Sequence, residues 1–126
     1  MCLIVKKNAH FKYAKRNIVV YKVIEKGHNY LRTPYQHMPI AIGETYKESN
    51  LHVILGEVTT GLHSFCRLWS TKKLCKKMTK SSQERIKYII TKCIIPKGSK
   101  YIKGRVNGEY FEKGYVSDTL TYVKVI

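Results

Sequence analysis

Acidic side chains are scarce in this chain. Its 126 residues include 8 Asp and Glu against 24 Lys and Arg, which gives a formal net charge of +16. An excess of one sign destabilises a compact chain through self-repulsion, and a negatively charged partner relieves that repulsion. The composition therefore favours anionic partners over neutral or cationic ones.

The chain also lacks paired cysteines and long apolar stretches. Cys2, Cys66, Cys75 and Cys93 form no C-x-x-C pair, so we expect free thiols in a reducing compartment. No stretch approaches the roughly 18 apolar residues that span a bilayer, and no secretory leader is recognised. We therefore expect a cytoplasmic protein, in the host cell if a phage encodes it, with no membrane partner.

Metal-ligand spacing is absent as well. No two histidines lie at the helical i, i+4 spacing, and the cysteines lack the spacing of a zinc ribbon. We therefore expect no metal and no cofactor. Cys2 is a remaining catalytic candidate, because removal of Met1 would expose it as an N-terminal nucleophile, but a buried strand thiol is the preferred interpretation.

The residues that are present predict short strands around one helix. Runs rich in β-branched and aromatic residues predict strands at residues 3–5, 18–24, 51–55, 88–95, 101–103 and 115–125. Turn residues at 96–99 and at Asn107-Gly108 separate some of them. The pattern predicts one α+β domain over residues 1–126, with short, largely antiparallel strands packed with one main basic helix.

The helical pattern begins near residue 70. Ser70 or Thr71 is a suitable N-cap, and Leu74, Cys75 and Met78 fall on one face. The opposite face is expected to be broadly positive, because five lysines recur on it. They are Lys72, Lys73, Lys76, Lys77 and Lys80.

This helix lies in the most basic stretch of the chain. Residues 67–87 contain eight Lys or Arg and one acid, Glu84, a net charge of +7. Such a density predicts binding of phosphates, in nucleic acid or in a nucleotide, and the preponderance of Lys over Arg predicts little sequence preference. We expect Tyr88 or Tyr101 to stack on bases. The expected phosphate-binding residues are Arg67, Lys72, Lys73, Lys76, Lys77, Lys80 and Arg85.

A second candidate site is the segment Gly61-Leu62-His63-Ser64-Phe65. We expect a sharp turn that brings the His63 imidazole close to the Ser64 hydroxyl, a pair suited to ligand binding or to acid–base chemistry. A structural role for His63 stays open, because no acid lies near it in sequence to orient the imidazole.

Four segments, taken in order, resemble known proteins. They are Val20-Tyr21-Lys22-Val23, residues 61–65, residues 95–102, which begin Ile-Pro-Lys-Gly, and residues 115–120. Their order, over most of the chain, is similar to that in a group of small uncharacterised proteins of phages and their bacterial hosts. More distantly, they resemble the ADP-ribosyltransferase fold, where a strand with Arg or His, a Ser motif, a proline-x-glycine segment and a Glu-bearing strand build an NAD pocket.

The second resemblance implies an enzyme site made of Lys22, His63, Ser64 and Asp118. Lys22 stands where that family has Arg or His, and Ser64 fits its Ser motif. Ser117-Asp118 stands where the family has Glu, the carboxylate that stabilises an oxocarbenium-like centre. This departure leaves two interpretations of the resemblance open, an active enzyme and a degenerate relative that binds a nucleotide without turning it over.

Three functions follow from these residues. The preferred one is a small basic binding protein that engages nucleic acid or a phosphorylated nucleotide through the Lys-rich helix. The alternatives are an ADP-ribosyltransferase-like enzyme, active or degenerate, and an inhibitor that docks on an acidic protein of a phage or its host. The first and the last differ only in what carries the negative charge.

Overall fold

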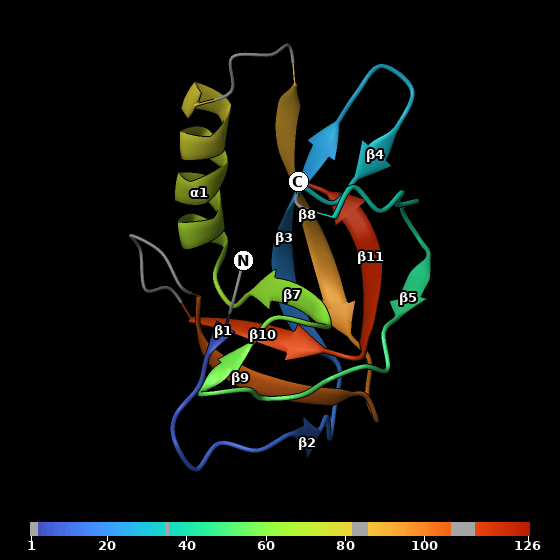
Figure 1. Cartoon of the computed structure of the whole chain (residues 1–126). Coiled ribbons are helices and arrows are strands. Elements are labelled where there is room, and N and C mark those ends of the chain that lie inside the picture. Colours follow the sequence, from blue (N-terminus) through green and yellow to red (C-terminus); the bar gives the residue numbers. More distant parts are fainter. Residues whose placement is uncertain (1–2, 35, 82–85, 107–112) are drawn as a thin grey trace.

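The computed structural model describes residues 3–34, 36–81, 86–106 and 113–126. Within these ranges one helix accompanies a sheet of short and medium strands (Figure 1). The elements are β1 (Leu3–Ile4), β2 (Lys12–Tyr13), β3 (Ile18–Lys26), β4 (Leu31–Arg32), β5 (Thr45–Lys47), β6 (Glu57–Val58), β7 (Leu62–Phe65), α1 (Leu68–Ser81), β8 (Lys87–Ile95), β9 (Lys100–Val106), β10 (Lys113–Ser117) and β11 (Thr119–Val125).

The strands form one sheet in the order β5-β11-β8-β3-β7-β10-β9-β1-β6, with β2 paired to β9 and β4 paired to β3. The pairs are antiparallel. The predicted fold class is confirmed in its broad form. The described chain is one small domain of mainly antiparallel sheet, in which helix is the minor part.

A single residue pair joins the two halves of this sheet. β3 pairs with β8 along its full length, but it pairs with β7 only through Tyr21 and Phe65. In Figure 1, β3 and β11 run upward and β8 runs downward between them, whereas β7, β9 and β10 run across this group. The sheet is therefore bent at the β3–β7 junction, and the two halves separate beyond Tyr21.

Each face of the bent sheet covers a hydrophobic core. The core inside the bend consists of Ala14, Val20, Ile24, Ile40, Leu62, Cys93, Ile95, Leu120 and Tyr122. The core on the opposite face consists of Leu3, Val5, Val58, Phe65, Ile102, Val106 and Val116. Because alternate residues of a strand point to the same side, Lys22 shares the inner face of β3 with Val20 and Ile24. A cation therefore projects toward the inner core.

The helix covers the opposite face of β3 and β8. Leu74 packs against the second core, and the Cys75 thiol donates a hydrogen bond to the backbone carbonyl of Tyr88 at 3.3 Å. The side of α1 predicted to be apolar thus faces the sheet, which leaves the lysine side outward.

The start of the helix differs from the prediction. α1 begins at Leu68, so Ser70 and Thr71 lie inside its first turn rather than at its N-cap. Their hydroxyls donate hydrogen bonds back to the carbonyl of Arg67, at 3.1 and 2.7 Å. Ser and Thr hydroxyls inside a helix can bond backward to a carbonyl of the preceding turn instead of capping it, so the residue type alone gave the wrong position.

The strand predicted at residues 51–55 is wrong. Ile54 and Glu57 exchange backbone hydrogen bonds across Leu55-Gly56, whose φ angles of 52° and 76° form a tight two-residue turn. Leu51 still packs against the second core, but the Leu55 side chain is 98% exposed at the turn. The predicted hairpin bend at Asn107-Gly108 lies outside the described residues.

Candidate functional site

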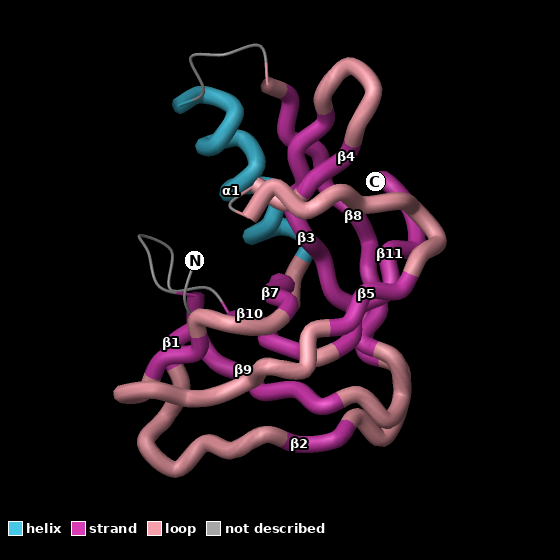
Figure 2. The backbone as a smooth tube through the Cα atoms, turned by 45° about the vertical axis from the view of Figure 1, so that its right-hand side comes forward, coloured by secondary structure: helices cyan, strands magenta, loops and turns pink. Residues whose placement is uncertain are grey.

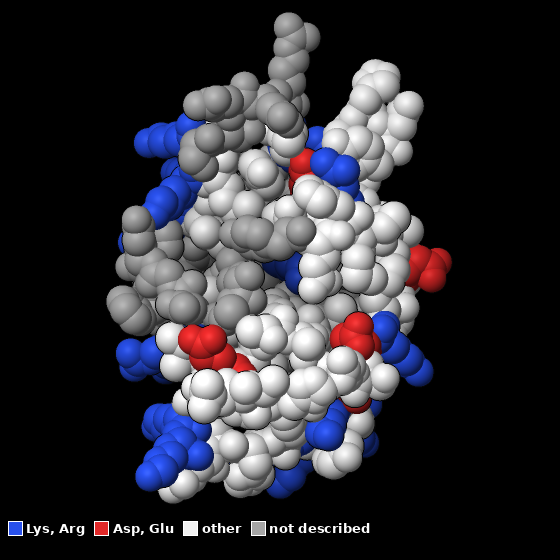
Figure 3. Space-filling view, in the orientation of Figure 1, with Lys and Arg blue, Asp and Glu red and all other residues white. Residues whose placement is uncertain are grey.

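The outward face of α1 carries its lysines. The α1 lysines are Lys72, Lys73, Lys76, Lys77 and Lys80. At about 100° per residue, these positions share one side of the helix, opposite the positions that face the sheet. Lys77 is partly buried and the other four are exposed. Figure 3 shows Lys and Arg side chains gathered along the edge of the molecule where α1 lies in Figure 1.

No carboxylate of α1 offsets these charges, because residues 68–81 contain neither Asp nor Glu. Lys76 lies four residues from both Lys72 and Lys80, so neighbours along the helix carry like charge. Each such pair costs roughly 0.2–0.5 kcal/mol of helix stability. An anion bound along the row would remove that cost.

Trp69 adds an aromatic surface to the same helix. Its side chain is 49% exposed, and the ammonium of Lys73 lies over its ring, 4.9 Å from the centroid. The sequence analysis missed Trp69, although the i, i+4 spacing from Lys73 could have revealed it. Tryptophan that keeps this much surface in water is suited to stacking on a base.

More cations lie at the start of the helix. The pKa of the Cys66 thiol is raised by burial, while Lys103, Lys113 and Arg67 act on it in the opposite direction, so these three cations lie around one thiol. Lys113 also stands directly opposite Arg105 across the β10–β9 ladder. Arg67 is thus part of a wider basic surface. The other predicted arginine, Arg85, lies outside the described residues.

Tyr88 and Tyr101, the tyrosines predicted to stack on bases, are both partly buried against other parts of the protein. Tyr101 is partly buried against the inner core, and its ring meets that of Tyr115 edge to face with the centroids 5.7 Å apart. Tyr88 is partly buried on β8, and its carbonyl accepts the bond from Cys75 of α1. Trp69 therefore exposes more aromatic surface beside the α1 lysines than either tyrosine.

His63 and Ser64 lie on opposite faces of a strand. The sharp turn expected there is β7, so consecutive side chains point to opposite sides. The Ser64 hydroxyl is buried and has no hydrogen-bond partner among the described residues. The structure therefore does not form a His63–Ser64 pair.

Asp118 has a local role in the turn between β10 and β11. Its carboxylate accepts hydrogen bonds from the backbone N–H of Lys100 and from the Thr119 hydroxyl, each at 3.0 Å. Its backbone N–H donates a hydrogen bond to the carbonyl of Lys100, and its carbonyl accepts one from the N–H of Glu48. The described residues that line the cavity containing Lys22 and His63 do not include Asp118.

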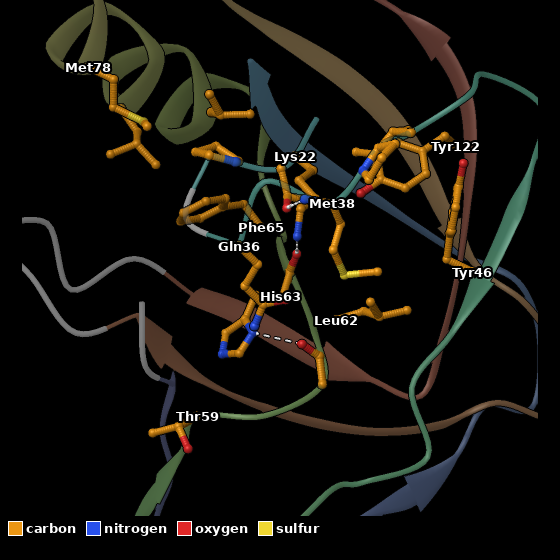
Figure 4. A pocket seen from close by; sticks show the side chains of 17 residues that line it. Lys22, Gln36, Met38, Tyr46, Thr59, Leu62, His63, Phe65, Met78 and Tyr122 are labelled. Atoms are coloured by element: carbon orange, nitrogen blue, oxygen red, sulfur yellow. Dashed lines mark hydrogen bonds between the residues drawn. The ribbon is translucent and has the colours of Figure 1, made fainter. Parts of the chain in front are cut away.

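Lys22 and His63 do come together, at the point where the sheet halves separate. The Lys22 ammonium donates a hydrogen bond to the backbone carbonyl of His63 at 2.7 Å (Figure 4). The sequence separation is 41 residues. Both residues line a cavity of about 200 Å³.

The imidazole of His63 is held by backbone carbonyls. Nδ1 lies 3.2 Å from the carbonyl oxygen of Gly61, and Nε2 lies 3.2 Å from that of Val58. A neutral imidazole has one N–H, so each tautomer donates to one of the two carbonyls. Burial lowers the pKa of His63 to about 4, and the nearby Lys22 charge acts in the same direction. His63 is therefore neutral near pH 7.

The cavity has walls from both halves of the sheet and from the helix. Figure 2 shows the segment between β4 and β5 crossing in front of β3 toward α1, and this segment closes one side. In Figure 3 a hollow near the middle of the same face has a cationic side chain at its base. The lining residues are Lys22, Val23, Thr33, Pro34, Gln36, Met38, Pro39, Ile40, Tyr46, Thr59, Gly61, Leu62, His63, Phe65, Leu74, Met78 and Tyr122.

Other kinds of site have less basis in the structure. The described His, Cys, Asp and Glu side chains form no group of three that could hold a metal ion. Among the described segments, no helix is both long and apolar enough to cross a bilayer. A cavity of about 200 Å³ is also below the roughly 300–1,000 Å³ of pockets for drug-sized ligands, which disfavours a whole dinucleotide there.

The chain was compared with protein-family models, with curated proteins and with solved structures. None of the three comparisons found a match. The two resemblances noted in the sequence stay predictions.

Proposed function

We propose that this protein binds the phosphate backbone of nucleic acid along the outward face of α1. The observation that carries the proposal is the row of α1 lysines on one exposed side of a helix that contains no carboxylate. The spacing of the row repeats the charge along the helix axis, as an extended polyanion requires. A small ion would reach only one or two of these ammonium groups.

The chemistry of the row indicates binding without sequence preference. Ammonium groups act as point charges on phosphate oxygens and lack the planar fork with which arginine reads guanine. Binding of this kind releases counterions, so the affinity falls steeply with salt. Arg67, Lys103 and Lys113 extend the positive surface past the start of α1.

Trp69 favours single strands over duplex. Its partly exposed ring lies among the cations, and a stacked base contributes roughly 1–3 kcal/mol when unpaired bases are available. In a duplex the faces of the bases are occupied by their neighbours, so the ring has no stacking partner there.

A charge-matched pair of variants tests the proposal. The first replaces the exposed row Lys72, Lys76 and Lys80 with Gln. The control replaces Lys12, Lys47 and Lys124, which are also exposed but lie on β2, β5 and β11, away from α1 in Figure 1. Both variants lose three charges, so only the position of the loss differs.

The measurement is binding of a labelled oligothymidylate by fluorescence anisotropy from 50 to 300 mM salt. We expect the α1 variant to bind at least tenfold more weakly at low salt and with a shallower salt slope, since each lost phosphate contact reduces the slope by about 0.7 for a single strand. Equal losses in the two variants would show that net charge, and not α1, is responsible. Wild-type binding to poly-glutamate that is as tight as binding to the oligonucleotide would identify an acidic protein as the partner.

A further inference from the structure

Lys22 places a cation in surroundings that are largely shielded from water, which is unfavourable for a charge. It extends from the inner face of β3 into the cavity between the sheet halves, and it is partly buried. One of its three N–H donors bonds the His63 carbonyl at 2.7 Å. A carbonyl oxygen has only a partial charge, so this bond compensates little of the cost of removing an ammonium from water.

No carboxylate in the described structure neutralises this ammonium. Within the described ranges, the Glu25 carboxylate forms an ion pair with Arg32 at 2.6 Å and lies 3.4 Å from Nδ1 of His37, and Lys22 takes part in neither contact. Glu25 follows Lys22 by three residues on β3 and so belongs to its other face. Its carboxylate is already engaged.

Among the described residues, three titratable groups that face Lys22 are neutral near pH 7. They are His63 on β7, Cys93 on β8 and Tyr122 on β11, and the Tyr46 side chain on β5 also lines the cavity. Burial raises the pKa of Cys93 to about 11 and also raises the pKa of Tyr122. Helix α1 contributes only Leu74 and Met78 to the cavity wall. The described lining therefore gives the cavity a positive potential and supplies no counter-charge to Lys22.

The rest of the lining is mostly apolar. Val23, Ile40, Leu62, Phe65 and Leu74 are among the side chains around the space, and Gln36, Thr33 and Thr59 provide hydrogen-bonding groups. A dry cavity of about 150 Å³ accommodates benzene, so about 200 Å³ accommodates one aromatic ring with a small substituent. The geometry thus combines an apolar chamber with one cation.

We propose that this cavity binds a small amphipathic carboxylate, with its carboxylate against the Lys22 ammonium and its apolar body among the side chains of the chamber. The ion pair would form where little water competes, so its strength would exceed that of a surface pair. This site is separate from the outward face of α1, and neither proposal depends on the other.

A carboxylate fits better than a phosphate ester. Phosphate-binding sites supply several donors, from arginine forks, backbone nests or helix N-termini, whereas Lys22 is the one Lys or Arg among the described lining residues. A carboxylate carries a single charge and two oxygens, which one ammonium and a neighbouring hydroxyl or amide can satisfy. A nucleotide is also too large for the space.

Benzoate and benzyl alcohol are matched probes for this site, because they share a ring and differ in charge. We expect benzoate to bind the wild-type protein at least tenfold more tightly than benzyl alcohol by isothermal titration calorimetry at pH 7. Lys22→Met should remove this preference and leave the affinity for benzyl alcohol unchanged. Lys26→Met, which removes an exposed charge from the same strand, should leave both affinities unchanged.

A measurement on the wild-type protein keeps the test valid if Lys22→Met fails to fold. The pKa of Lys22 is lowered to about 8, chiefly by desolvation, so its side-chain NMR resonances should titrate well below those of an exposed lysine. Saturating benzoate should raise that midpoint by at least one pH unit while the Lys26 resonances stay in place. Equal affinity for the two probes, benzoate binding that survives Lys22→Met, or an unmoved Lys22 midpoint would each overturn the proposal.

Discussion

The α1 lysines and Lys22 are the same side chain in two environments. The α1 lysines stand in a row, mostly in water, where their fields add together and salt screens them. Lys22 projects into the bend of a sheet, where its pKa falls to about 8. The comparison teaches that exposure suits many weak contacts with an extended polyanion, whereas burial suits one strong contact with a small ion.

The largest expected effect is on the free energy of unfolding, compared between Lys22→Met and the wild-type protein. Lys22→Met removes a desolvated charge, and a pKa shift from 10.5 to about 8 corresponds to about 3 kcal/mol. The folded protein binds fewer protons than the unfolded chain between pH 8 and 10.5, so the penalty is full below pH 8 and disappears as the pH rises through that window. The variant should therefore gain up to about 3 kcal/mol at pH 7 and almost nothing above pH 10.5.

Urea denaturation at pH 7 and at pH 10.5 measures both values. Lys80→Met is the control, because an exposed lysine of α1 should change the free energy of unfolding by less than about 0.5 kcal/mol. An equal increase in the free energy of unfolding at both pH values would show that Lys22→Met acts through packing and not through desolvation.

A somewhat smaller effect is expected on acidification, from the neighbour of Lys22. The pKa of His63 falls from 6.5 to about 4 in the fold, so the unfolded chain binds more protons between pH 4 and 6.5. Stability is then complete above pH 6.5 and decreases as the pH falls, by about 2 kcal/mol at pH 5. His63→Gln should flatten this loss, and His28→Gln, which changes an exposed histidine, should preserve it. Unfolding free energies at pH 7 and pH 5 decide the matter, and parallel losses in all three proteins would refute the assignment.

The smallest expected effect is on nucleic-acid affinity, and it concerns Trp69 on the exposed side of α1. Trp69→Ala should weaken binding to an oligothymidylate by roughly fivefold to tenfold, since a lost stacking contact costs about 1 kcal/mol or more. Binding to a duplex of equal length should change little. Tyr13→Ala is the control, because Tyr13 is an exposed aromatic residue on β2. Anisotropy titrations give each affinity, and a loss for duplex as large as that for the single strand would exclude stacking by Trp69.

The longest strands and the lysine face of the helix could be predicted because local pattern determines them. The β-branched run that forms β3 and the apolar run of β8 specify strands wherever they lie. The spacing of the α1 lysines likewise determines a common side once the segment is helical. The strand prediction at 51–55 failed because the chain turns back at Leu55-Gly56 and leaves Leu55 in water, which an apolar run does not reveal.

The cavity could not be predicted, because it depends on contacts between distant segments. Lys22 lies in a strand that is apolar on both sides, with Val19, Tyr21 and Val23 alternating with Val20 and Ile24. Alternation therefore does not reveal which side is enclosed. The His63 carbonyl that receives its hydrogen bond belongs to another half of the sheet. The proximity of Lys22 to His63 was expected from a resemblance, but the separation of Asp118 and Ser64 from them was not.

The single pair at the bend, Tyr21 with Phe65, leaves a short length of strand uncovered. On that side of β3, residues 22–24 lie between this pair and the pairing of Glu25 with Arg32 in β4. An unpaired strand edge can form hydrogen bonds with a strand of another molecule, and an inward-pointing charged residue is one of the features by which natural sheets prevent this. Lys22 lies in this unpaired stretch. Lys22→Met should therefore raise the free energy of unfolding of the single molecule and also make the protein more prone to aggregate at high concentration.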